Sequence, residues 1–384
     1  MRSQSHRRGV PAWLGLGLVW AVPSAAAVLT LSQARAVVTV DGKSISKEVQ
    51  LPYHWDRANP GQQGGAVFDI DFDLPQAHGG VWGIYLPRLG NAYELWLNGV
   101  KLQAHGEMVQ QQGDTSVYNG ADFGRVPRYI TVDGGHMQSS NHLRIHIRAD
   151  VGRRGGLAPV VIGPQTEVFP LYERDYRWRV TGSVAVVAFC FVVGLTALAL
   201  WTTDAGVPDS TRSGRDPLFF FVAVAQLFWA VYVGDVLVEA PLLPWPWWGV
   251  VQVIALDVWG GSMALACMEL TDWQSNTWVV RLRQGILWLM VMAPAASLWA
   301  LSQGQPLVLT SWYVAYGGTL LVFILGFLWR AFGHANAEQR ILAAAALVNI
   351  VVALRDIYVF RFDASYGANT WLRYSSVLFG LALG

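Results

Sequence analysis

Five residues in the first half of the chain have side chains suited to binding a small molecule. Guanidinium groups form paired hydrogen bonds with carboxylates and phosphates, and an aromatic face packs well against a sugar ring. These residues are Arg88, Trp96, Arg148, Arg153 and Arg154. They predict a pocket for a carbohydrate or an organic anion. The alternative interpretation is that the arginines lie in loops, where they hold Asp150 or contact the membrane surface.

The same region does not have the pattern of a metal site or an active site. The aspartates of residues 69–73 are spaced like the start of a calcium loop, but Leu74 and Gly80 stand where that loop needs glycine and glutamate. On one strand, His142 and His146 would lie roughly 13 Å apart, too far to chelate one ion. The sequence contains no Ser/His/Asp set, phosphate loop, HExxH or CxxC motif. We therefore expect no metal site and no catalytic residues in this chain.

Four charged residues lie in otherwise apolar segments of the second half, namely Asp235, Asp257, Arg355 and Asp356. A charge at membrane depth costs several kcal/mol unless it is paired or faces water. Arg355 is expected to pair with Asp257 or Asp235, because the adjacent residues Arg355 and Asp356 point about 100° apart on a helix. The network could be a structural ion pair or a signalling switch, and a proton or ion pathway would use the same residues.

Strand patterns position the first set of residues. Residues 67–74 alternate strictly, with four apolar side chains on one face and three aspartates on the other. Residues 93–102 predict a β-hairpin in which Asn98 and Gly99 supply the positive φ angles of a type I′ turn. Residues 143–148 alternate again. These segments predict an antiparallel β-sandwich over residues 37–175.

Apolar runs long enough to cross a bilayer follow this domain. They cover about 180–201, 217–239, 247–270, 285–302, 308–329 and 341–360, and a seventh begins near Trp371. Arginines occur in alternate connections, at Arg212 and Arg215, Arg281 and Arg283, and Arg330 and Arg340. The connections Pro241–Pro246 and Gln303–Pro306 carry none. The positive-inside rule therefore predicts that the arginine-bearing side is cytoplasmic and that the β domain lies outside.

Both ends of the chain carry further signals. In residues 1–36, basic residues precede the apolar stretch Val10–Leu31, and Ala34-Arg35-Ala36 has the form of a cleavage site. This segment is either a signal peptide or an uncleaved anchor. At the other end, residues 371–384 supply about 21 Å of helix, so we expect the last span to be incomplete and to continue into the cytoplasm.

Composition agrees with a membrane protein. The chain is 53% hydrophobic and 14% charged, which is too apolar for an ordinary soluble enzyme. Its net charge is +1, and no basic stripe with interleaved aromatic residues follows the first ten residues, so nucleic acid is not an expected partner. The expected partner is the lipid bilayer.

Several segments resemble known families. The hairpin LWLNGVKL and the strand NHLRIHIRAD resemble those of the galactose-binding-like jelly roll. With the seven expected spans added, the region from about residue 37 to residue 384 resembles the bacterial seven-transmembrane receptors with diverse intracellular signalling modules. Three further segments look most like those of the receptors that carry a histidine kinase. They are LPYHWDRANPG, YLPRLGNAYELWLNG and IRADVGRRGGLAP.

The resemblance implies a multidomain membrane protein. Residues 37–175 would form a periplasmic, all-β jelly-roll sensor domain, and residues 176–384 an all-α seven-helix transmembrane bundle in the bacterial inner membrane. The short connection Tyr172–Trp178 would relay ligand occupancy from one to the other.

The resemblance also implies an output module that this chain lacks, since no kinase motif is present in it. A two-component histidine kinase is expected, which would use ATP and Mg²⁺ and act on a response regulator from a homodimer. No cofactor is expected in the chain itself. A diguanylate cyclase output is the alternative, and a membrane binding or transport protein without an output domain stays open as a different class of function.

Overall fold

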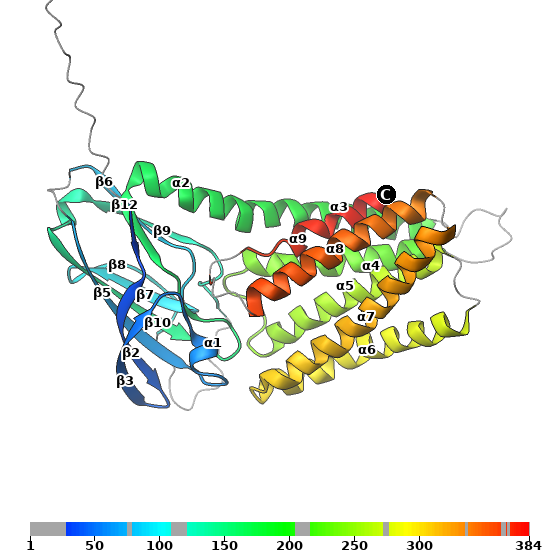
Figure 1. Cartoon of the computed structure of the whole chain (residues 1–384), viewed down its shortest axis with the longest axis horizontal. Coiled ribbons are helices and arrows are strands. Elements are labelled where there is room, and N and C mark those ends of the chain that lie inside the picture. The colour runs from blue at the N-terminus through cyan, green and yellow to red at the C-terminus, as the bar shows by residue number, and fades with distance from the viewer. Residues whose placement is uncertain are drawn as a thin grey trace, which may run out of the picture.

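The computed structural model describes residues 28–74, 79–108, 121–203, 216–271, 276–334, 337–361, 366 and 369–383. A β domain and a set of long helices follow one another along the long axis of the molecule (Figure 1). Most of the expected export segment, residues 1–27, lies outside this described part, and so do Arg212 and Arg215.

The β domain consists of two antiparallel sheets around one hydrophobic core. In spatial order, the smaller sheet contains β1 (Leu29–Leu31), β12 (Val160–Pro164), β6 (Val81–Leu86) and β9 (Arg128–Asp133). The larger sheet contains β3 (Lys43–Gln50), β2 (Gln33–Val40), β5 (Gly64–Asp73), β10 (Ser140–Ala149), β7 (Ala92–Leu97) and β8 (Val100–His105). The short pair β4 (Tyr53–His54) and β11 (Gly156–Leu157), helix α1 (Trp55–Ala58) and the 3₁₀ turn η2 (Gly134–His136) complete the domain. The predicted β domain is therefore confirmed.

The alternation of residues 67–74 has the expected meaning. Phe68, Ile70 and Phe72 on β5 are buried in the core between the sheets. The aspartates point to the other face, where Asp71 is exposed. Asp69 on that face is only 8% exposed, because side chains of the neighbouring strand β10 cover it. One strand thus buries an apolar face and presents an acidic one.

The predicted hairpin is formed by β7 and β8. Its turn residues have positive φ angles, 50° at Asn98 and 81° at Gly99. Glycine adopts this conformation without steric penalty and asparagine tolerates it, so the Asn-Gly pair sets the register of the two strands. Leu95 and Leu97 consequently face the core.

The β domain begins earlier than the expected boundary at residue 37. β1 starts at Leu29, and β2 contains Ala34 and Ala36, both buried in the core. The small side chains that resemble a cleavage site are placed inside a sheet between β3 and β5. A cleavage site needs small residues, and a strand that packs closely on its neighbours also favours short side chains. The same alanines therefore fit either structure.

In the part of the chain that the structure describes, six helices are long and apolar enough to cross a membrane. They are α3 (Gly182–Thr203), α4 (Pro217–Gly234), α5 (Trp247–Leu270), α6 (Thr277–Ser302), α7 (Pro306–His334) and α8 (Ala337–Arg361). Helix α4 ends in the 3₁₀ turn η5 (Asp235–Leu237). The segment of the expected seventh span contains two short helices, α9 (Leu372–Ser375) and α10 (Val377–Leu383). Six candidate spans are shown, and the seventh stays a prediction.

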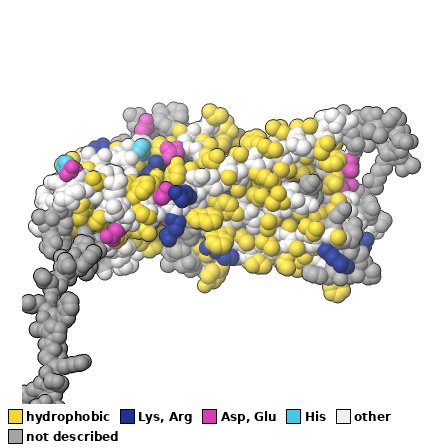
Figure 2. All heavy atoms as spheres, turned by 90° about the horizontal axis from the view of Figure 1, so that it is seen from above, with side chains coloured by type: hydrophobic (Ala, Val, Ile, Leu, Met, Phe, Trp, Pro, Cys, Tyr) yellow, Lys and Arg dark blue, Asp and Glu magenta, His cyan; other side chains and the backbone are white. Residues whose placement is uncertain are grey.

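Helix α5 lies inside the bundle, and two glycines allow its close approach to its neighbours. A Cβ at Gly260 would lie 2.8 Å from Leu320 of α7, and one at Gly261 would collide with Met290 of α6. Small residues at helix contacts are typical of membrane bundles, where close backbone packing replaces the hydrophobic driving force. On the face shown in Figure 2, the surface of the helices is mainly hydrophobic, and charged side chains gather near their two ends.

The first span is continuous with a helix of the β domain. Helix α2 (Gln165–Tyr176), the π-helical turn η3 (Arg177–Thr181) and α3 follow one another without a break, and Figure 1 shows them as one long rod. The α2 part packs on the smaller sheet, where Tyr172 stacks on Tyr129 with ring centroids 5.3 Å apart. The segment that we expected to be a short connection is therefore a rigid part of this helix.

Candidate functional site

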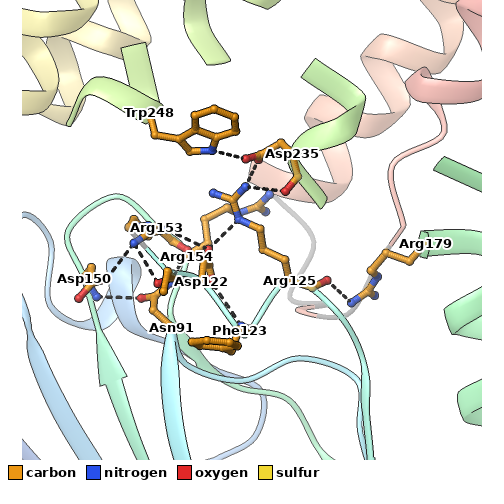
Figure 3. Close-up of polar contacts among 12 residues, drawn as sticks. Asn91, Asp122, Phe123, Arg125, Asp150, Arg153, Arg154, Arg179, Asp235 and Trp248 are labelled. Carbon is orange, nitrogen blue, oxygen red and sulfur yellow. Dashed lines mark hydrogen bonds and ion pairs between the residues drawn. The ribbon is translucent and has the colours of Figure 1, made fainter. Parts of the chain in front are cut away.

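The β domain and the helices meet at a polar junction (Figure 3). Arg125, in the segment before β9, forms an ion pair with Asp235 in η5. Asp235 also accepts a hydrogen bond from Trp248 Nε1 at 2.7 Å. Arg128, the first residue of β9, pairs with Glu239 at 2.6 Å. Charges from the β domain thus hold the connection between α4 and α5.

A buried charge cluster supports this junction from the β side. Arg153 Nη1 donates to Asp150 Oδ2 at 3.2 Å, and Arg153 Nη2 lies 3.9 Å from Asp122 Oδ2. Asn91 fixes the loop, since its Oδ1 accepts from the Asp150 backbone N–H at 2.9 Å. Burial lowers the pKa of Arg153, while the two carboxylates oppose that change. Although burial disfavours its charged form, Arg125 and Arg153 hold the pKa of Asp122 below its ordinary value.

Arg179 extends from the helical side into the same junction. Its Nη1 donates to the Pro87 carbonyl at 2.8 Å, and its Nε donates to Asn369 Oδ1 at 3.1 Å. It lies in η3, and π-helical turns occur frequently at functional sites. Arg373 on α9 donates to the Arg179 carbonyl at 3.1 Å and to Ser183 Oγ at 2.6 Å. The rod and the last helices therefore share one hydrogen-bonded corner.

These groups surround a cavity of about 240 Å³. The side chains that line it include Asp235, Trp245, Asn369 and Thr370. Six arginines line it as well, Arg88, Arg125, Arg153 and Arg154 from the β domain and Arg179 and Arg373 from the helical side. Neither region forms this cavity alone.

The structure brings together part of the predicted ligand pocket. The predicted residues that line the cavity are Arg88, Arg153 and Arg154. Arg148 lies beside it and donates through Nε to Asp150 Oδ1 at 3.0 Å, which agrees with the alternative of an arginine that holds this aspartate. Trp96 is on the outward face of the larger sheet, under Lys101 Nζ at 5.4 Å from its ring centroid. Trp96 therefore does not belong to this cavity.

Three of the lining arginines were not predicted from the sequence. Arg125 lies in an irregular segment, and Arg179 lies just after the segment that we expected to be a short connection. Arg373 was only a single charge near the start of the last apolar run. The sequence does carry one signal for Arg179, which is the position of a charged residue next to a long apolar run. An arginine that is buried at such a position needs polar partners.

Two of the four charges in apolar segments have partners that we did not expect. Asp235 lies at the junction with Arg125 rather than inside the bundle. Asp257 is fully buried on α5, and its Oδ2 accepts from Trp312 Nε1 at 2.7 Å. The Tyr316 hydroxyl donates to the Asp257 carbonyl. Within the described chain, Asp257 Oδ1 has no hydrogen-bond partner.

The other two charges pair with each other. Arg355 Nη1 lies 2.8 Å from Asp356 Oδ1, so the expected pairs of Arg355 with Asp235 or Asp257 are not formed. Arg355 Nη1 also donates to the Asn369 carbonyl at 2.9 Å, and Asp356 accepts from the backbone N–H of Trp371. The long guanidinium side chain bends over the helix surface to reach its neighbour. This pair therefore anchors the segment that leads from α8 to α9.

Histidine and acidic residues of the outer sheet face form a pairing network. His142 Nδ1 lies 2.7 Å from Asp71 Oδ1, and its Nε2 lies 3.0 Å from Asp69 Oδ1. Arg144 donates to the same Asp69 oxygen at 2.6 Å. In the part of the chain that the structure describes, no three His, Cys, Asp or Glu side chains are gathered in a way that would hold a metal ion.

Comparisons with known proteins give partial similarities only. No family model matches the sequence, and no curated protein matches it. Among solved structures, a GH2 β-galacturonidase from Eisenbergiella tayi, bound to galacturonate, is 11% identical over 36% of this chain and 24% of its own, with a TM-score of 0.25. A β-glucuronidase from Faecalibacterium prausnitzii is 12% identical over 35% of this chain and 31% of its own, with a TM-score of 0.26. The chain thus spans less than a third of the length of either enzyme.

Proposed function

We propose that this chain is the sensing part of a bacterial transmembrane receptor. In this proposal the β domain lies in the periplasm and detects a small ligand. The helical region crosses the inner membrane and passes the signal to a cytoplasmic module, a two-component histidine kinase. The kinase would phosphorylate a response regulator, and a diguanylate cyclase is the alternative output.

The observation that carries the proposal is the continuous helix from Gln165 to Thr203. Its first part is attached to the smaller sheet through Tyr172, and Tyr85 of β6 donates a hydrogen bond to Asp175. A helix without a flexible break transmits translation and rotation over its whole length, because each residue is fixed by hydrogen bonds to the preceding turn. A change in the sheet would therefore move the first span.

The junction gives this movement something to act against. The Arg125–Asp235 and Arg128–Glu239 pairs join the β domain to the connection between α4 and α5. One region of the β domain thus holds α3 and another holds the α4–α5 connection. A ligand that binds two arrangements of these attachments with different affinity would shift the balance between them.

The distribution of charge supports the proposed orientation. The arginine-free connections after α4 and α6 lie at the β-domain end, where Asp122 N–H donates to the Glu239 carbonyl at 2.9 Å and Gly61 is close to Gly304. The arginines Arg281, Arg283, Arg330 and Arg340 lie in the ends of α6, α7 and α8 that adjoin the connections at the opposite end. The proposal includes a seventh span, of which α9 and α10 would be the beginning.

Two experiments test the proposal. The reading frame that follows codon 384 in the gene should encode a kinase or cyclase module, and a stop codon there would contradict the receptor. If a module follows, its activity is measured in membrane vesicles with Gly-Ser-Gly-Ser inserted after Tyr176, which breaks the rod at η3. The matched control carries the same insertion after Gly42, in an exposed turn at the far edge of the larger sheet.

With the insertion after Tyr176, the activity of the output module should no longer change with the composition of the medium on the β-domain side. With the control insertion, the activity should still respond to that medium. An unchanged response in both variants would show that the helix does not carry the signal.

A further inference from the structure

Arginine side chains dominate the lining of the junction cavity. Six guanidinium groups line it. Asp235 is the carboxylate among the lining residues. Asp122 and Asp150 pair with Arg125 and Arg153, and Asp150 is shared with Arg148. The guanidinium groups of the lining thus outnumber its carboxylate, in a site where neighbouring protein strengthens their repulsion.

From this arginine-rich lining we infer that the cavity binds a compact oxyanion, a dicarboxylate or a phosphate ester. The inference deepens the proposed receptor function and rests on it for its biological meaning. The ligand would lie between the β domain and the helices and contact arginines of both.

The Arg88 guanidinium has donor capacity left for such a ligand. Arg88 Nε is buried and has no hydrogen-bond partner among the described residues. Its guanidinium lies 5.0 Å from the ring centroid of Tyr366, which holds it at the cavity without neutralising its charge. The Tyr366 hydroxyl donates to the Arg154 carbonyl, so the ring itself is fixed. Arginine in a fixed orientation binds planar carboxylates and phosphates through two parallel hydrogen bonds.

The lining favours an anion over a neutral sugar. A sugar site needs an open aromatic face, and the Trp245 ring already has the Arg153 guanidinium 5.1 Å from its centroid. The neutral polar side chains of the lining are Asn369 and Thr370, and each has a partner within the protein. The donors that surround the space are therefore mainly charged.

The volume of the cavity, about 240 Å³, accommodates a small ligand. A water molecule occupies about 30 Å³ in the liquid. Succinate and small phosphate esters fit a space of this size.

Occupancy would also change the junction. Arg88 and Arg154 from the β domain and Arg179 and Arg373 from the helices repel one another across the space when no anion lies between them. An oxyanion that contacts both sets replaces this repulsion by attraction. Binding would therefore draw the end of the rod towards the β domain.

The test uses the full chain in nanodiscs of phosphatidylcholine at low salt. Binding of succinate, inorganic phosphate and glucose is measured by calorimetry, and the thermal midpoint is followed by tryptophan fluorescence. The variant is Arg88→Gln. The control is Arg174→Gln, an arginine of α2 whose side chain is 67% exposed and which does not line the cavity. If Arg88→Gln fails to fold, Arg154→Gln replaces it, because Arg154 is exposed.

We expect succinate or phosphate to bind the native chain, with an affinity at least tenfold lower in Arg88→Gln and unchanged in Arg174→Gln. A second arm contains phosphatidylglycerol in the nanodisc. A thermal midpoint that rises with this lipid in the native chain, but not in Arg88→Gln, would support the same site with a lipid headgroup as the source of the oxyanion.

Three results would overturn the inference: no effect of either anion or of phosphatidylglycerol, tighter binding of glucose than of both anions, or equal losses in Arg88→Gln and Arg174→Gln. None of these results depends on the helix insertion after Tyr176, so a failure here is distinguishable from a failure of the receptor proposal.

Discussion

Arg125 of the β domain and Asp235 at the end of α4 form an ion pair across the junction of the two regions. They are far apart in the sequence, and the pair joins a loop of the sandwich to a candidate membrane span. Arg125 also donates through Nε to Asp122 at 2.7 Å. The guanidinium therefore links a buried carboxylate of the β domain to one of the helical region.

Replacing Asp235 by Asn should weaken the junction. Both side chains of the pair are about one-fifth exposed, so we expect a loss of about 1–2 kcal/mol, between the values for surface and buried pairs. The thermal midpoint of the chain in detergent measures this loss. The control is Glu94→Gln, which removes the more exposed pair with Lys101 and should change the stability by about 0–1 kcal/mol. Equal shifts in the two variants would contradict a special role of the Arg125–Asp235 pair.

The junction should lose stability in acid through Asp122. Its pKa is lowered in the folded protein by Arg125 and Arg153, against the effect of burial. Asp122 therefore contributes stability that is complete above the ordinary aspartate pKa of about 3.9 and is lost as the pH falls below that value. Unfolding by denaturant at a series of pH values from neutral to 3 measures this contribution. Asp122→Asn should be less stable at neutral pH and should lose less on acidification, and parallel curves for the two proteins would refute the assignment.

Asp257 should act mainly as a hydrogen-bond acceptor for Trp312. Asp257→Asn keeps an oxygen that accepts from Trp312 Nε1, whereas Asp257→Ala removes the acceptor of this half-buried donor. We expect Ala to be less stable than Asn by about 1–3 kcal/mol, which is the usual penalty for an unsatisfied buried polar group. Thermal unfolding in detergent compares the two variants. If Ala and Asn are equally stable, the hydrogen bond does not hold α5 to α7.

Gly182 should be required for the contact between the rod and α9. A Cβ at this position would collide with the hydroxyl of Tyr374, which donates to the Trp178 carbonyl. Gly182→Ala should therefore destabilise the chain by about 1–3 kcal/mol, the usual cost of overpacking. Gly285→Ala in α6 is the control, because no atom lies within 4 Å of its added methyl group, and there the higher helix propensity of alanine should stabilise by up to about 1 kcal/mol. A stabilising effect at both positions would argue against the close packing of α3 on α9.

Most of the fold could be predicted from the sequence because its signals are local. The alternation of residues 67–74 places Phe68 in the core, and Asn98-Gly99 has the φ angles of the expected turn. The six apolar runs match six long helices, although their ends differ by several residues. The segment 172–178 was expected to be a short connection. It is instead part of a continuous helix, whose α2 part packs on the smaller sheet.

The sequence by itself determined where strands, turns and apolar helices form, since side-chain periodicity and hydropathy depend on neighbouring residues. It also predicted a pocket that contains Arg88, Arg153 and Arg154. Only the tertiary structure decided that Arg179 and Arg373 line the same cavity as these three and that Asp235 pairs with Arg125 rather than Arg355. The partner of a charge is set by which surfaces come together when the domains dock, and no local pattern in the chain encodes that choice.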